Sequence, residues 1–176
     1  MVSSTPPPAA GALHDALLLL GSNIRPAECL PAARRLLEGL GRVVRTSRVW
    51  ESPPVGFADQ ANFCNGAIHL QTALTPAELK ERLREIEAIL GRVRDPDNRN
   101  APRTIDLDIG LYDDWVSREA GLTIPDPDIA TRAFVAIPLA EIAPDTRHPV
   151  TGRRLAEIAA DLEIGAGLQP RADILL

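Results

Sequence analysis

The sequence has few aromatic residues, fewer basic than acidic residues, and no long hydrophobic run. Basic residues number 19 against 24 acidic ones, which leaves a formal net charge of −5. This balance, with aromatic residues at 3%, argues against an RNA-binding module, which is expected to be basic and to expose aromatic rings. No apolar run approaches the roughly 20 residues of a membrane-spanning helix. We therefore expect neither nucleic acid nor a membrane as a partner.

The two cysteines, Cys29 and Cys64, have neither the spacing of a metal site nor that of a disulfide framework. We expect free thiols and a cytoplasmic protein. Residues 1–14 are rich in proline, alanine and serine and have no basic segment ahead of an apolar one, which predicts a disordered tail and not a signal peptide. Residues 15–176 are long enough for one domain and contain no internal repeat.

The order of predicted elements is βαββαβ. Apolar runs and alternating segments predict strands at residues 15–21, 42–51, 63–72 and 104–112. Helical spacing predicts a helix at 26–39 and a second that begins at Pro76, with Thr75 as its cap, and stops at Gly91. This order predicts an α+β fold with a ferredoxin-like core, in which helices pack on an antiparallel sheet. Two C-terminal helices follow, one after "PDPD" and one within "GRRLAEIAADLE".

The strand "TIDLDIG" carries two carboxylates, although aspartate is depleted in strands. Because strand side chains alternate between faces, Asp106 and Asp108 point the same way and repel each other. One explanation is that they line a solvated face. The other is a divalent cation such as Mg²⁺, which takes one or two carboxylates and completes its shell with water and substrate phosphates.

An arginine-rich loop precedes that strand. It contains Arg92, Arg94, Arg99 and Arg103. The charges of such a loop are often only solvated, but arginine is also the preferred partner of phosphate oxygens. The sequence contains neither a Walker A loop nor a kinase-type glycine-rich loop. A nucleotide would therefore have to be held by arginines and a metal ion.

The segment "ESPPVGFADQANFCNGA" is a third candidate. It can be a rigid connection that leads into a strand. Alternatively, its prolines fix the backbone so that Ser52 and Val55 present main-chain groups to a flat ligand. Phe63 and Asn65 share one face of the next strand, where an aromatic ring and an amide can stack on a heterocycle and bind its edge.

Together, "LGSN", "SPPVG", "GRVR", "APRTIDLDI" and "TIPDPDIATRAFVAIPLAEIAP" resemble the 6-hydroxymethyl-7,8-dihydropterin pyrophosphokinase family of folate biosynthesis. The resemblance spans residues 16–155. It implies a ferredoxin-like core, two Mg²⁺ ions, and transfer of the β,γ-diphosphate of ATP to the hydroxymethyl group of the pterin with release of AMP. It also implies a monomer or weak homodimer that binds only small molecules.

The resemblance also assigns roles to residues. It implies that Asp106 and Asp108 hold both metal ions and that Arg92 and Arg103 contact the transferring phosphates. The residues implied in pterin binding are Ser52, Val55, Phe63, Asn65 and Phe134, with the two phenylalanines sandwiching the ring. Those implied around the nucleotide are Glu87, Arg94, Arg99, Thr123 and Arg132. In "LGSN", we instead expect Ser22 or Asn23 to cap the first helix.

The chain departs from the family pattern at several places, among them Asn100 where an aromatic residue is common, an arginine-rich loop about one residue longer, and the two positions described next. Pro125 is followed by Asp126 where the family has histidine, and Ala101 stands where it has glycine. We expect Asp126 to turn away from the nucleotide, either by capping a helix that begins at Pro127 or by pairing with Arg99 or Arg132. These departures leave one alternative function, a paralogue that binds pterin or nucleotide with little or no turnover.

Overall fold

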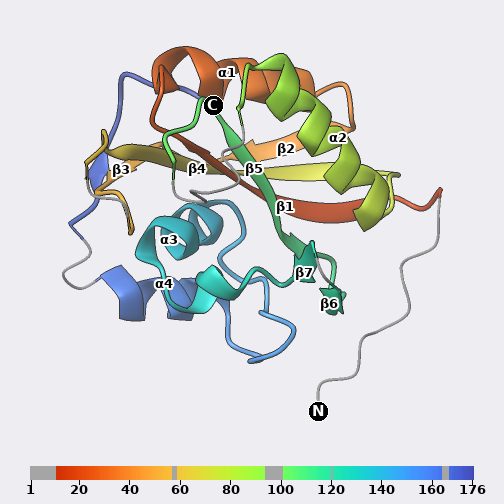
Figure 1. Ribbon diagram of the computed structural model, residues 1–176. Helices are drawn as coiled ribbons and strands as arrows, with labels where there is room; N and C mark the ends of the chain where they lie inside the picture. The colour runs from red at the N-terminus through yellow and green to blue at the C-terminus, as the bar shows by residue number, and fades with distance from the viewer. Residues whose placement is uncertain (1–10, 57–58, 94–100, 120, 164–166) are drawn as a thin grey trace.

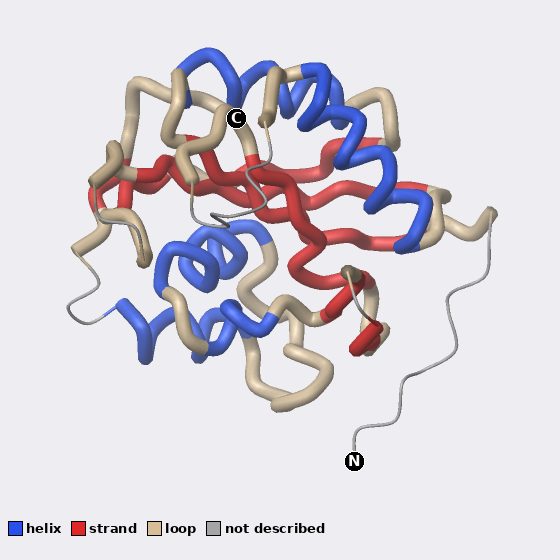
Figure 2. Tube along the Cα trace, viewed as in Figure 1, coloured by secondary structure: helices blue, strands red, loops and turns tan. Residues whose placement is uncertain are grey.

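The computed structural model describes residues 11–56, 59–93, 101–119, 121–163 and 167–176. A six-stranded antiparallel sheet lies between two layers of helices (Figures 1 and 2). The sheet order is β5-β1-β4-β3-β8, and β2 pairs with the other end of β4. Its strands are β1 (His14–Ser22), β2 (Arg42–Thr46), β3 (Trp50–Ser52), β4 (Phe63–Thr72), β5 (Asp106–Tyr112) and β8 (Gln169–Pro170). The predicted ferredoxin-like α+β fold is confirmed.

One face of the sheet is covered by helices α1 (Pro26–Leu37) and α2 (Pro76–Ile89), as Figure 1 shows. Leucines and isoleucines from both helices and from β1, β4 and β5 form the main buried core between them. The predicted start of α2 is confirmed, because Thr75 and Glu78 form a reciprocal capping box. Burial of this apolar layer is the main stabilising contribution to the fold.

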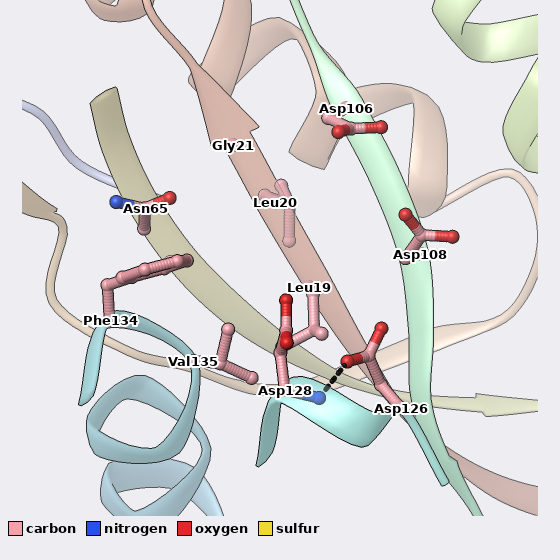
Figure 3. Close-up of a pocket in the computed structure, with 11 residues that line it drawn as sticks. Leu19, Leu20, Gly21, Asn65, Asp106, Asp108, Asp126, Asp128, Phe134 and Val135 are labelled. Atoms are coloured by element: carbon pink, nitrogen blue, oxygen red, sulfur yellow. Dashed lines mark hydrogen bonds between the residues drawn. The ribbon is translucent and has the colours of Figure 1, made fainter. Parts of the chain in front are cut away.

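The opposite face is partly covered by α3 (Ala133–Ile142) and α4 (Leu155–Glu163), which form a second buried cluster with β1 and β4. The 3₁₀ helix η1 (Pro127–Ala130) precedes α3. Because α3 and α4 cover only part of this face, the ends of β1, β4 and β5 remain open beside η1 and α3 (Figure 3).

The structure corrects the predicted strand at residues 42–51. It is two strands, β2 and β3, with a break at Ser47–Val49. Ser47 N–H still donates to Ala67 O at 2.9 Å, but the Ser47 hydroxyl accepts the return hydrogen bond from Ala67 N–H at 2.8 Å, so a side chain replaces one bond of the ladder there. Both strands still pair with β4.

Three short strands were not predicted. Strands β6 (Ser117–Glu119) and β7 (Leu122–Ile124) form a separate hairpin, and β8 pairs with β3. Strands of two or three residues are too short to show a period in the sequence. After β8 the chain returns to the main core, where Ile174 is buried.

Residues 1–10 of the predicted tail lie outside the described residues, and His14 already belongs to β1. Cys29 and Cys64 are buried free thiols, as predicted. Within the described ranges, the helices are all too short or too polar to cross a membrane.

Candidate active site

The two aspartates of β5 share one face of the strand, as predicted (Figure 3). Leu107 and Ile109 point to the other face and belong to the main core. Because β5 is an edge strand beside α2, basic side chains from outside the sheet can reach its carboxylates. The repulsion between Asp106 and Asp108 is therefore offset by neighbouring cations.

Asp106 forms ion pairs with two of the predicted arginines. Arg103 Nη1 lies 2.6 Å from Asp106 Oδ2, and Arg92 binds Oδ1. Burial by itself raises the pKa of the Asp106 carboxyl, but the two guanidinium groups outweigh it and hold that pKa below its usual value. Asp106 is therefore ionised at neutral pH, and its carboxylate pairs with both arginines.

Glu87 is almost completely buried and lies behind Arg92. Its Oε1 accepts a hydrogen bond from Leu107 N–H at 2.9 Å and pairs with Arg92. Glu87 thus fixes the Arg92 guanidinium against β5. A direct role at the nucleotide, which the family resemblance implied, stays a prediction.

The predicted cap in "LGSN" is wrong. The helix cap position is Arg25, and no side chain caps α1 there. Ser22 Oγ donates to Thr104 O at 2.6 Å, and Asn23 Oδ1 accepts from Arg103 N–H at 2.8 Å. These residues instead tie the end of β1 to the segment that leads into β5, and so they position Arg103.

Lys80 is the cation beside Asp108, and sequence reasoning missed it. Its ammonium group pairs with Asp108 Oδ1 and lies 3.5 Å from Leu107 O. Lys80 and Glu87 are seven residues apart on α2 and so lie on the same face of the helix. Two ionisable residues on a face otherwise turned toward the core were the available signal.

Asp126 caps η1, as predicted, by accepting a hydrogen bond from Asp128 N–H at 2.8 Å. The expectation that it turns away from the site is wrong, because it lines the same cavity as Asp106 and Asp108 (Figure 3). Burial, followed by the charges of Asp108 and Asp128, outweighs the hydrogen bond from Asp128 N–H and raises the pKa of Asp126 to about 6. Arg132 pairs with Asp128, at 3.9 Å, and not with Asp126.

Two cavities adjoin these residues. The first, of about 140 Å³, is lined by the four aspartates 106, 108, 126 and 128, by the end of β1, and by Asn65, Gly66, Phe134 and Val135. The second, of about 340 Å³, is lined by Ser52, Pro53, Pro54, Val55, Thr131, Arg132, Ala133, Phe134, Leu162 and Leu168. Phe134 belongs to both.

Three predicted pterin residues meet at the junction of the cavities. Asn65 Nδ2 donates to Ser52 Oγ at 2.9 Å, so a hydrogen bond joins the first cavity to the second. Phe134, at the start of α3, forms the wall between them. Phe63 lines neither cavity, and its ring lies under the Arg103 guanidinium at 5.7 Å. A sandwich of Phe63 and Phe134 around a ligand therefore stays a prediction.

The remaining nucleotide residues are less well placed or not described. Thr123 is exposed on β7, and Arg132 borders the second cavity. Arg94 and Arg99 lie outside the described residues.

The two aspartates of β5 fit a magnesium site to which the protein contributes few ligands. Within the described parts of the chain, no three metal-binding side chains converge on one point. Asp106 and Asp108 offer hard oxygen ligands beside an open cavity, and Mg²⁺ commonly takes the rest of its shell from water and phosphate. The donor set therefore fits Mg²⁺ bound together with a polyphosphate.

Fold and site together define the class, a ferredoxin-like α+β enzyme whose acidic, arginine-flanked cavity suits polyphosphate transfer. The sequence model of the 7,8-dihydro-6-hydroxymethylpterin-pyrophosphokinase (HPPK) family matches residues 17–144. The chain belongs to this family, whose members are ATP-dependent diphosphokinases of folate biosynthesis.

Relatives from distant bacteria agree. The chain is 44% identical over 144 residues to the 2-amino-4-hydroxy-6-hydroxymethyldihydropteridine pyrophosphokinase of Pseudomonas aeruginosa, covering 80% of this chain and 87% of that protein. It is 40% identical over 139 residues to the Bacillus subtilis protein of the same name, covering 77% and 82%. These names favour an active enzyme over the alternative of a paralogue with little turnover.

The fold also matches a crystal structure of Plasmodium falciparum HPPK-DHPS, with a TM-score of 0.69 at 14% identity. The match covers 85% of this chain and 45% of that longer chain. At this identity the likeness shows the fold alone.

Proposed function

We propose that this chain transfers the diphosphate of ATP to the hydroxymethyl group of 6-hydroxymethyl-7,8-dihydropterin, releasing AMP, at the junction of the two cavities. One observation carries the assignment of the site. An acidic cavity flanked by arginines and a larger cavity between a proline-fixed loop and α3 share Phe134 and are joined by the Asn65–Ser52 hydrogen bond. Two substrates can therefore lie with their reacting ends together.

The first cavity is the proposed place of the transferring phosphates. Asp106 and Asp108 would hold two Mg²⁺ ions, which supply charge neutralisation of the phosphates and orientation of the attacking hydroxyl. Arg92 and Arg103 lie beside the same carboxylates. Phosphoryl transfer depends mainly on positioning and on charge stabilisation, and the remaining N–H groups of both guanidinium groups could donate to phosphate oxygens as the ligand enters.

The second cavity is the proposed place of the pterin. Ser52 ends β3 and Val55 lies on the loop fixed by Pro53 and Pro54, and Phe134 offers an aromatic face on the other side. Asn65 lies between the cavities, where its amide can bind the edge of a heterocycle. The hydroxymethyl group would then point toward the aspartates of β5.

The proposal extends to the setting of the enzyme. The substrates are small molecules, and we propose a cytoplasmic monomer or weak homodimer with two Mg²⁺ ions per site. Buried free thiols at Cys29 and Cys64 are consistent with a reducing compartment.

The direct test is an assay of the purified protein with ATP, Mg²⁺ and 6-hydroxymethyl-7,8-dihydropterin. We expect AMP and the pterin diphosphate in equal amounts, resolved by anion-exchange chromatography. Release of ADP or inorganic phosphate in place of AMP would contradict transfer of a diphosphate. Binding of both substrates with no product would instead support the paralogue without turnover.

Asn65→Leu should weaken pterin binding. Leucine has a similar volume but leaves the polar edge of the ligand and the Ser52 hydroxyl without a partner, which costs about 1–3 kcal/mol. We expect the Kd for the pterin, measured by calorimetric titration, to rise by about 5- to 150-fold. The Kd for an ATP analogue should change little, and equal losses for both ligands would indicate general damage to the site.

A further inference from the structure

Lys80 is the single lysine of a chain whose other basic residues are all arginines. It lies on α2, and its side chain is 17% exposed, so that its aliphatic stem is largely buried beside β5. Its ammonium group pairs with Asp108 Oδ1 and lies 3.5 Å from the carbonyl oxygen of Leu107. A compact positive charge thus lies against one of the two carboxylates proposed to bind metal.

The charges around the first cavity are divided unequally. Asp106 has two arginine partners, whereas Lys80 is the cation that pairs with Asp108 among the residues that the structure describes. Asp126 lines the cavity as well, and the charge of Asp108 acts on it. Without the ammonium group, the nearest described positive charge acting on Asp108 would be the Arg92 guanidinium, which already pairs with Asp106 and Glu87.

We propose that Lys80 is a positioning residue that stands in for a divalent cation at Asp108 in the ligand-free protein, so that a metal ion binds there tightly only together with a polyphosphate. The proposal rests on the proposed function, because it assumes that Asp108 binds metal. It adds a residue that neither the sequence pattern nor the family comparison assigned.

The physical reason is competition between like charges. A lone metal ion at Asp108 must displace the ammonium group or remain beside it, and both cost free energy at short range. A polyphosphate that arrives with the metal offers the ammonium group new oxygen acceptors. Because lysine is a mobile point charge on a flexible stem, it can move from a carboxylate to a phosphate without a change in the backbone.

The test uses Mn²⁺ alone, with free Mn²⁺ measured by electron paramagnetic resonance. Lys80→Met keeps the apolar stem and removes the charge, and we expect it to bind Mn²⁺ about tenfold more tightly than wild type. Lys80→Arg should restore weak binding. Arg82→Met removes an exposed charge from the same helix and, because solvent and salt screen such a charge, should stay within about twofold of wild type.

The same titration is then repeated with a non-hydrolysable ATP analogue at saturation. We expect the advantage of Lys80→Met to vanish or reverse, because the phosphates now take the ammonium group away from Asp108. A residue that only fastens α2 to β5 would give weaker or unchanged Mn²⁺ binding in both titrations. Weaker or unchanged Mn²⁺ binding by Lys80→Met, measured without the analogue, would overturn the proposal.

Asp108→Asn separates this proposal from the proposed function. If Asp108→Asn weakens Mn²⁺ binding while Lys80→Met has no effect, the role of Lys80 alone is wrong. If Asp108→Asn binds Mn²⁺ as wild type does, the metal role of Asp108 is wrong, and the Lys80 proposal falls with it. Should Lys80→Met fail to fold, Lys80→Gln provides a second neutral variant, whose amide can still donate to Asp108.

Discussion

Asp106→Asn is expected to abolish turnover and also to destabilise the protein. The loss of a metal-binding carboxylate should lower kcat by about a thousandfold or more. The loss of stability follows from Arg92 and Arg103, which are 10% and 14% exposed and would lose their shared counter-charge. Removing one partner of a buried ion pair leaves an uncompensated charge. Because Glu87 still pairs with Arg92, we expect the free energy of unfolding to fall by about 2–3 kcal/mol. Urea denaturation at pH 7 measures it.

Asp108→Asn is the matched control. Its side chain is 45% exposed, and Lys80 can turn its ammonium group to solvent. We expect an equal loss of turnover with less than about 1 kcal/mol of lost stability. Equal destabilisation by the two variants would contradict the assignment of the buried arginines to Asp106.

The Asp106 ion pairs also predict an acid sensitivity. The pKa of this carboxyl is held below its unfolded value, so its contribution is present above that value and is lost as the pH falls through the folded pKa. The wild-type protein should therefore lose stability below about pH 4 in a way that Asp106→Asn does not.

Asp126→Asn is expected to stabilise the ligand-free protein at pH 7.5. Burial, followed by the charges of Asp108 and Asp128, raises the pKa of Asp126 to about 6, so the ionised carboxylate disfavours the folded state. A rise of about two pKa units corresponds to about 3 kcal/mol. Asparagine can still accept the capping hydrogen bond from Asp128 N–H, so the cap is kept.

The sign of this effect makes it testable. Because the folded pKa lies above the unfolded one, stability is greatest below the unfolded pKa and is lost as the pH rises through about 6. The advantage of Asp126→Asn should therefore fall to about 0.5 kcal/mol at pH 4. Thermal unfolding in a metal-free buffer at both values measures it. A gain that is equal at the two pH values would show that charge is not its cause.

Asp128→Asn is the control for that pair of measurements. Asp128 is half exposed and pairs only loosely with Arg132. A solvent-exposed pair of this kind contributes less than about 1 kcal/mol. If Asp128→Asn stabilised the protein as much as Asp126→Asn does, the assignment of the destabilising charge to Asp126 would be wrong.

Local pattern was sufficient for most of the fold. The Thr75 cap of α2 and the alternation of β5 are properties of a few neighbouring residues, and both were predicted. The prediction of one strand at residues 42–51 was wrong because the break depends on a hydrogen bond from Ala67 N–H to the Ser47 hydroxyl, and these two residues are twenty positions apart. Similarly, β8 exists only because the chain end returns to β3.

The site divides in the same way. Alternation in the sequence placed Asp106 and Asp108 on one face and showed that they need a counter-charge. The sequence also supplied the family motifs that identify the reaction, because these are runs of neighbouring residues. Which cation serves each carboxylate was decided only in the folded chain, since Lys80 is 28 residues from Asp108 and reaches it because α2 packs beside the edge strand β5. Likewise, the neighbouring residues in the sequence make Asp126 a helix cap. It lines the acidic cavity only because η1 lies beside β5 in the folded chain, where burial and the charge of Asp108 raise its pKa.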